Sequence, residues 1–174
     1  MSIIYKKLPH INTLNHYQFV TFRTYDSLDA YLRNIESSNL SNAKKQLHID
    51  EYLDISSDGR YFQGAVLVYM REFLLSLDGV YYELVSFVIM PNHIHILFYQ
   101  KEALSIILKK LKGTSSLTIN KMLQKKGKFW ASGYYDKAIR DEKHFEVVYN
   151  YIKNNPLKAG VGDVDVDVRY FSKY

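Results

Sequence analysis

Apolar positions along the chain predict four β-strands. Residues 17–25 (YQFVTFRTY) alternate apolar and polar side chains, which is the period of a strand with one buried face. Residues 81–89 and 93–100 are largely apolar, and a Pro-Asn turn separates them. Residues 134–140 form a weaker fourth candidate. The expected sheet therefore has four strands.

A spacing of three or four residues between apolar positions predicts helices between these strands. It occurs over residues 62–77 and 103–111, and a Gly-Thr-Ser-Ser run interrupts or caps the second helix before it resumes over 117–124. A short helix is also expected within 26–39.

The last helix is expected over residues 142–154. Asp141 is a suitable N-cap, and Pro156 should end the helix because the residue before a proline resists helical geometry. Tyr151 lies off the apolar stripe of this helix, and Asn155 shares its face one turn later. The stripe itself consists of Phe145, Val148, Tyr149 and Ile152.

The order of these elements predicts an α+β fold of the ferredoxin-like (RRM-like) type, with helices packed on one face of an antiparallel sheet. A chain of 174 residues that is 47% hydrophobic is expected to form one domain, residues 1–174. Two parts stay outside the pattern: the tail at 161–174 and the polar segment Ser41–Gly59, expected as loops and short helix. The acids of that segment are expected to be solvated and not to hold a metal: Asp50, Glu51, Asp54 and Asp58.

Composition narrows the chemistry. The chain has no cysteine, so disulfides and thiolates are excluded and any metal must be held by nitrogen and oxygen ligands. Neither a run of eighteen apolar residues nor a signal peptide over residues 1–10 is visible. The protein is expected to be cytoplasmic, with no membrane partner.

Lysine dominates residues 101–130, with eight lysines and one acid in a chain whose formal net charge is +5. Such a block favours an anionic partner, most simply nucleic acid, although a solvated helix face is the alternative. Trp130 either stacks on a base or packs in the core, and Arg140 pairs with a phosphate or with a neighbouring acid. The candidate DNA contacts are Lys109, Lys110, Lys112, Lys126, Lys128, Trp130 and Arg140.

His93 and His95 are the first candidates for chemistry. They are two residues apart on a predicted strand, so both imidazoles project from the same face. Such a pair forms half of a metal site; two core histidines that only make hydrogen bonds are the alternative. With the amide oxygen of Asn155 as a third ligand, one divalent cation would bind a phosphate that the phenol of Tyr151 attacks. Mg²⁺ prefers oxygen, so a site with two imidazoles should also accept Mn²⁺.

Several motifs together resemble a known family. Met-Pro-Asn-His-Ile-His over 90–95 is followed by Gly-Tyr-Tyr-Asp at 133–136, Ile-Arg-Asp-Glu at 139–142 and Tyr-Ile-Lys-Asn-Asn-Pro-Leu-Lys-Ala-Gly at 151–160. In this order they resemble the single-tyrosine transposases of the HUH class. The nearest branch is the one associated with repetitive extragenic palindromes (REP), a relative of the insertion-sequence-200-like enzymes. The similarity runs from about Tyr17 to Gly160.

The resemblance implies that His93 and His95 are metal ligands, that Tyr151 is the nucleophile and that Asn155 is the third ligand. It implies a strand transferase that cuts single-stranded DNA near hairpins, keeps a 5′-phosphotyrosine and releases a 3′-hydroxyl. Nucleoid association follows from such a partner. Asparagine rather than glutamine at 155 points to the REP-associated branch, which can act as a monomer, whereas insertion-sequence members act as homodimers.

Three other functions stay open from the sequence. A ferredoxin-like nucleic-acid-binding module would need exposed aromatics on its central strands, where this chain has histidines. A metallohydrolase would leave Tyr151 without a role. The third is a domesticated nickase with a host role. Separately, Tyr134 and Tyr135 are alternative candidates for the nucleophile.

Overall fold

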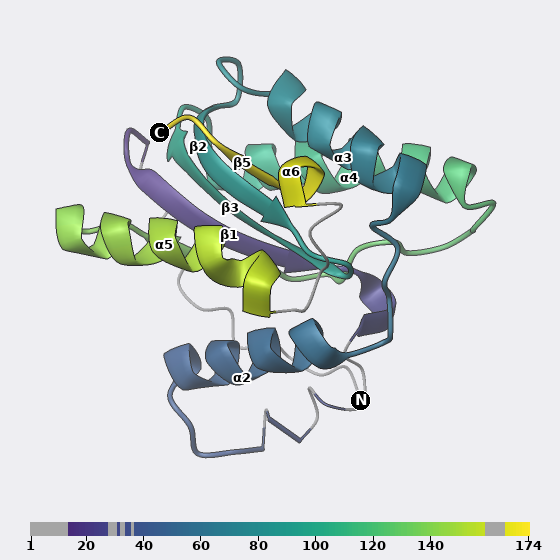
Figure 1. Cartoon of the computed structure of the whole chain (residues 1–174), viewed down its shortest axis with the longest axis horizontal. Coiled ribbons are helices and arrows are strands. Elements are labelled where there is room, and N and C mark those ends of the chain that lie inside the picture. The colour runs from purple at the N-terminus through teal and green to yellow at the C-terminus, as the bar shows by residue number, and fades with distance from the viewer. Residues whose placement is uncertain (1–13, 28–30, 32–33, 36, 159–165) are drawn as a thin grey trace.

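The computed structural model describes residues 14–27, 31, 34, 35, 37–158 and 166–174. At its centre is an antiparallel five-stranded sheet with the strand order β4-β1-β3-β2-β5 (Figure 1). The four predicted strands are confirmed. The strands are β1 (Tyr17–Arg23), β2 (Tyr82–Ile89), β3 (His93–Gln100), β4 (Tyr135–Ala138) and β5 (Tyr170–Ser172).

Helices connect and flank these strands. The described helices are η1 (Tyr25–Ser27), α2 (Asn42–Ile55), α3 (Gly64–Ser76), α4 (Leu104–Met122), α5 (Glu142–Lys158) and α6 (Val166–Arg169). The Asp141 carboxylate accepts from the backbone N–H of His144 at 2.8 Å, so Asp141 caps α5 as expected. None of the described helices is long and apolar enough to cross a membrane.

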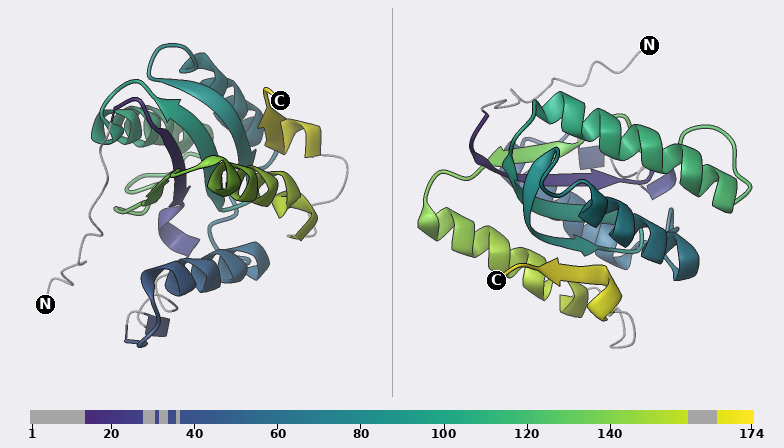
Figure 2. Two further views of the ribbon diagram at one scale, coloured as in Figure 1. Left: turned by 90° about the vertical axis from the view of Figure 1, so that its left-hand side faces the viewer. Right: turned by 90° about the horizontal axis from the view of Figure 1, so that it is seen from above.

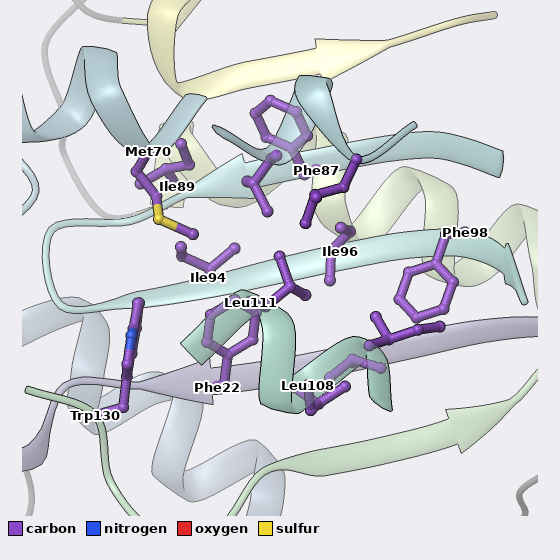
Figure 3. Packing of buried hydrophobic residues seen from close by; sticks show 14 of the residues in the cluster. Phe22, Met70, Phe87, Ile89, Ile94, Ile96, Phe98, Leu108, Leu111 and Trp130 are labelled. Carbon is purple, nitrogen blue, oxygen red and sulfur yellow. The ribbon is translucent and has the colours of Figure 1, made fainter. Parts of the chain in front are cut away.

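The α+β class is confirmed, but helices cover both faces of the sheet rather than one. Along β3, Ile94, Ile96 and Phe98 point into a core formed with α3 and α4 (Figure 3). Leu97 points to the opposite face and packs with residues of α5. The central strands are therefore buried on both sides, and α4 and α5 lie on opposite sides of the sheet (Figure 2). This double burial explains why β2 and β3 read as nearly continuous apolar runs.

The helix boundaries correct three expectations. The segment 41–59 holds the fourteen-residue helix α2, which the hydroxyl of Ser41 caps by accepting from Lys44 N–H. α4 runs without a break through the Gly-Thr-Ser-Ser stretch. α5 passes Pro156 instead of ending before it. The lost backbone hydrogen bond is tolerated because the helix ends two residues later and the proline ring is buried.

The C-terminal segment adds the edge strand β5, which pairs with β2 from Ser86–Ser172 to Val88–Tyr170. Sequence patterns did not predict this strand because it has only three residues. The helix expected within 26–39 lies partly outside the described residues.

Candidate active site

His93 and His95 face each other on the α5 side of β3. Both side chains are fully buried, and their Nε2 atoms are 3.1 Å apart. The Nδ1 atom of His93 donates to Asn92 Oδ1 at 2.8 Å, and the Nδ1 atom of His95 lies 2.7 Å from Thr21 Oγ1. These bonds turn the two imidazoles so that their Nε2 atoms lie within hydrogen-bond distance of each other.

Asn92 fixes the tautomer of His93. Its Nδ2 donates to the backbone oxygens of Leu53, at 3.0 Å, and Asp58, at 3.2 Å, so its Oδ1 is the atom that faces the imidazole. An amide oxygen only accepts, so Nδ1 of His93 carries the proton and Nε2 is free to bind a cation.

Burial keeps both imidazoles neutral. It lowers the pKa of His93 to about 3, and burial together with the neighbouring His93 lowers the pKa of His95 well below its usual value. Neutral imidazole is the form that binds metal ions. A cation held by both Nε2 atoms would replace the direct contact between them.

Helix α5 brings Tyr151 to the histidines of the same chain. The Tyr151 ring lies 5.2 Å from that of His95 and 6.0 Å from that of Phe19, both in edge-on contact. Tyr151 is half-buried, so its hydroxyl is not sealed in the core. The phenol and the imidazole are therefore in contact within one chain.

Asn155 lies one turn after Tyr151 and is 1% exposed. Its amide nitrogen and oxygen make no regular hydrogen bond within the described part of the chain, which is uncommon for a buried amide. The described residues also include no cluster of three His, Asp or Glu side chains able to hold an ion. Asn155 shares the Tyr151 face of α5 one turn later, so its amide oxygen is the candidate third donor with the two imidazoles, an N,N,O set that would suit Mn²⁺ and accept Mg²⁺.

Asp50 of α2 also belongs to this site, and the sequence expectation of a solvated loop was wrong for it. Asp50 is 6% exposed; its Oδ2 accepts the Tyr151 hydroxyl at 2.8 Å, and its Oδ1 accepts Gln46 Nε2 at 2.8 Å. Burial raises the pKa of Asp50 to about 7. Burial and the Asp50 carboxylate in turn raise the pKa of Tyr151 above its usual value, and Asn155 acts in the opposite direction.

Asp54 lies one turn after Asp50 on the same helix. Its Oδ1 is 3.8 Å from His93 Nε2, too far for a hydrogen bond, and its side chain is 15% exposed. Gln46, Asp50 and Asp54 are spaced four residues apart, which is typical of one face of a helix. This spacing could have predicted the polar face of α2, but apolar periodicity does not detect it.

The candidate DNA contacts fall into three groups. Trp130 is a core residue that lies with Phe22 in the buried cluster (Figure 3). It also packs on Phe62, and its indole N–H donates to Ser115 Oγ at 2.9 Å. Of the two alternatives that the sequence left open for Trp130, the structure supports core packing and not base stacking. Lys112 donates to the backbone oxygens of Ala131, at 2.6 Å, and Gly133, at 3.0 Å, which is a structural role.

The remaining candidates are solvent-accessible. Lys109 and Lys110 lie on α4, across the sheet from the histidines, and only Lys109 is fully exposed. Lys126 and Lys128 are exposed in the loop after α4. This loop joins the end of β1 through the Thr24–Trp130 bridge, next to the turn that carries Asn92. Arg140 is exposed before α5.

Comparison with known proteins identifies the family. Residues 60–155, more than half of the chain, match the family model described as "Transposase IS200 like". The chain therefore belongs to the IS200-like transposases, and it is an enzyme that cleaves and joins DNA. No curated protein matches it.

Two solved structures are similar in fold. The first is a REP-associated tyrosine transposase bound to a REP hairpin, with a TM-score of 0.52, 13% identity, and coverage of 90% of this chain and 75% of that one. The second, described as a candidate transposase of Deinococcus radiodurans R1, has a TM-score of 0.38, 14% identity, and coverage of 86% and 97%. At these identities the first likeness concerns the fold alone, and the second is too distant to support an argument.

Proposed function

We propose that the chain cuts and rejoins single-stranded DNA near hairpins through a covalent 5′-phosphotyrosine on Tyr151. The observation that supports the proposal is the meeting, within one chain, of the Tyr151 phenol and the paired imidazoles, with the buried amide of Asn155 one turn after the phenol on the same helix. The contact between the phenol and imidazoles that could bind a metal ion supports a chemical role for Tyr151.

His93, His95 and Asn155 would hold one divalent cation, Mg²⁺ or Mn²⁺. When bound, the ion would draw charge from the scissile phosphate and stabilise the leaving oxygen. Asn92 and Thr21 keep the two imidazoles in the orientation that this role requires.

Tyr151 then acts as the nucleophile. Its oxygen forms a bond to phosphorus while the bond from phosphorus to the 3′ oxygen breaks, which leaves a phosphotyrosine on the 5′ side and a free 3′-hydroxyl. The reverse attack by a 3′-hydroxyl rejoins the strand and releases Tyr151. The reaction needs no external energy because one ester replaces another.

Hairpin or single-stranded DNA is the proposed partner. The REP-associated structural neighbour was solved with a hairpin, and this chain has a net charge of +5 concentrated around α4 and the loop after it. Lys109, Lys110, Lys126, Lys128 and Arg140 are the side chains that remain available for phosphates. The proposed catalytic unit is a single domain that works as a monomer, an assignment supported by the contact of Tyr151 with His95 of the same chain.

A labelled single-stranded hairpin tests the proposal on a denaturing gel with Mg²⁺ or Mn²⁺. We expect a DNA–protein adduct that is absent from Tyr151→Phe and present in Tyr149→Phe. Tyr149 is a matched control because it lies two residues away and bonds Ser172 and the Tyr174 backbone instead. Cleavage without an adduct would indicate a hydrolase, and binding without cleavage would indicate a binding module. Calorimetry with Mn²⁺ alone tests the ligand set independently of activity.

A further inference from the structure

Helix α2 lies outside the part of the chain that matches the family, yet it supplies a side chain to the attacking atom. The family match covers residues 60–155, whereas α2 spans Asn42–Ile55 and lies next to α5 (Figure 1). Asp50 of this helix accepts the hydroxyl proton of Tyr151 in a 2.8 Å hydrogen bond. The nucleophile of the family domain is thus held by an element that the family match does not include.

We propose that Asp50 is the general base that takes the phenol proton of Tyr151 when DNA is cut and returns it when DNA is rejoined. This inference rests on the function proposed above for Tyr151. It assigns a catalytic role to a residue that touches the reacting oxygen.

The hydrogen bonds around Asp50 suit this role. Gln46 Nε2 donates to Oδ1 at 2.8 Å and holds the carboxylate in one orientation, which leaves Oδ2 for the phenol. Gln46 is one turn before Asp50, so both side chains come from the same rigid helix face. The proton of Tyr151 already points at the atom that would receive it, as general-base catalysis requires.

Burial supports the same assignment. Asp50 is 6% exposed, and its pKa is raised to about 7 by burial, with Asp54 and Glu51 adding to the increase. A base is most effective when its pKa lies near the working pH, because a large share of it is then ionised and it is still basic enough to hold the proton. A solvent-exposed aspartate would be a much weaker base.

The proton balance closes with water as the only other participant. During cleavage the phenol oxygen bonds to phosphorus, its proton moves to Asp50 Oδ2, and the 3′ oxygen leaves with the electron pair of the broken bond. That oxygen takes a proton from water and becomes the 3′-hydroxyl, while Asp50 keeps the phenol proton. During rejoining the 3′-hydroxyl returns its proton to the solvent as its oxygen attacks phosphorus, and the released phenolate of Tyr151 takes back the proton held by Asp50.

Asp50→Asn separates proton transfer from positioning. The amide oxygen of asparagine can still accept the Tyr151 hydroxyl, but it is not a base. Glu51→Gln is the matched control, since it removes one negative charge from the next residue of the same helix. Glu51 is exposed and pairs with His48 at 3.5 Å instead of with Tyr151.

Single-turnover formation of the DNA adduct measures the effect, with a labelled hairpin and Mn²⁺. We expect Asp50→Asn to slow adduct formation by about 10²- to 10⁴-fold, the usual contribution of a general base, with hairpin affinity changed less than threefold. Glu51→Gln should react at the wild-type rate. A fluorinated tyrosine at position 151, whose phenol is more acidic, should restore part of the lost rate in Asp50→Asn.

The outcomes are distinct. If Asp50→Asn reacts within threefold of wild type, or faster, the base assignment is overturned. If it is slow but the fluorinated tyrosine gives no recovery, Asp50 only positions the phenol and the proposal also falls. If wild type forms no adduct while Tyr151→Phe behaves identically, the proposed function itself has failed.

Discussion

The side chain of Asn92 holds the imidazole of His93: Nδ1 of the histidine donates to Oδ1 of the asparagine at 2.8 Å. The same asparagine bonds the backbone oxygen of Leu53 at the end of α2. One side chain thus orients a candidate metal ligand and also ties α2 to the sheet. Asn92 of the Pro-Asn-His motif therefore has two structural roles besides forming the turn: it orients His93 and it anchors the end of α2.

Asn92→Ala should weaken Mn²⁺ binding by about 10- to 100-fold, the usual cost of losing an outer-shell partner of a ligating histidine. Isothermal titration calorimetry measures the change. Asn120→Ala is the control, because Asn120 donates to Gly127 in the loop after α4, away from the site. An Mn²⁺ affinity in Asn92→Ala equal to that of wild type would contradict the ligand role of His93.

Asp50 should make stability depend on pH. Its pKa is about 7 in the folded protein and 3.8 ordinarily, so the folded state binds the proton more tightly. The resulting stabilisation is complete below about pH 3.8 and is lost as the pH rises through 7. Asp50→Asn lacks this dependence. The free energy of unfolding of Asp50→Asn relative to wild type should therefore rise by about 1.4 kcal/mol per pH unit over this interval.

Urea unfolding of metal-free protein at pH 4.5, 5.5 and 6.5 measures that difference. Glu51→Gln, which alters an exposed acid, should follow the wild-type curve within about 0.5 kcal/mol. A constant difference between Asp50→Asn and wild type across the three pH values would show that the carboxyl group is not held in a buried environment.

Trp130→Phe should reduce stability and leave DNA binding unchanged. The substitution removes the indole hydrogen bond to Ser115 and leaves part of a core position empty, which together cost about 1–4 kcal/mol. Denaturant unfolding and fluorescence anisotropy with a labelled hairpin separate the two effects. A loss of hairpin affinity in a well-folded variant would instead support base stacking by this residue.

The exposed lysines after α4 should contribute more to DNA binding than those on α4 itself. Lys126 and Lys128 lie in the loop that joins the sheet beside the Asn92 turn, whereas Lys109 and Lys110 lie across the sheet from the histidines. Replacing Lys126 and Lys128 by glutamine should lower hairpin affinity and reduce the salt slope by about 2. The matched pair Lys109→Gln and Lys110→Gln should have a smaller effect. The reverse order would place the DNA on the α4 face.

Much of the site could be predicted from sequence because it rests on simple periodicities. The two-residue spacing of His93 and His95 on a strand and the four-residue spacing of Tyr151 and Asn155 on a helix put each pair on one face. The structure brings Tyr151 of the second pair into contact with His95 of the first. The packing of α5 on the opposite face of the sheet from α3 and α4 could not be predicted from the sequence, because it depends on tertiary contacts.

Helix α2 escaped prediction for a different reason. Its inward residues include Gln46, Asp50 and Asp54, so the face that packs inward is largely polar. Hydrophobic periodicity detects a helix that covers a core and misses one that lines a polar site. The error about Asp50 follows from that rule, since an acid in a polar segment is usually solvated.

Peptide mapping of the covalent adduct tests the central claim most directly. Wild-type protein is incubated with a short single-stranded hairpin and Mn²⁺, digested with trypsin and nuclease, and analysed by tandem mass spectrometry. The peptide His144–Lys153 contains both Tyr149 and Tyr151, so fragment ions decide between them. We predict a nucleotide 5′-phosphate on Tyr151 alone. A modification on Tyr149, Tyr134 or Tyr135, or cleavage with no modified peptide, would contradict the assignment.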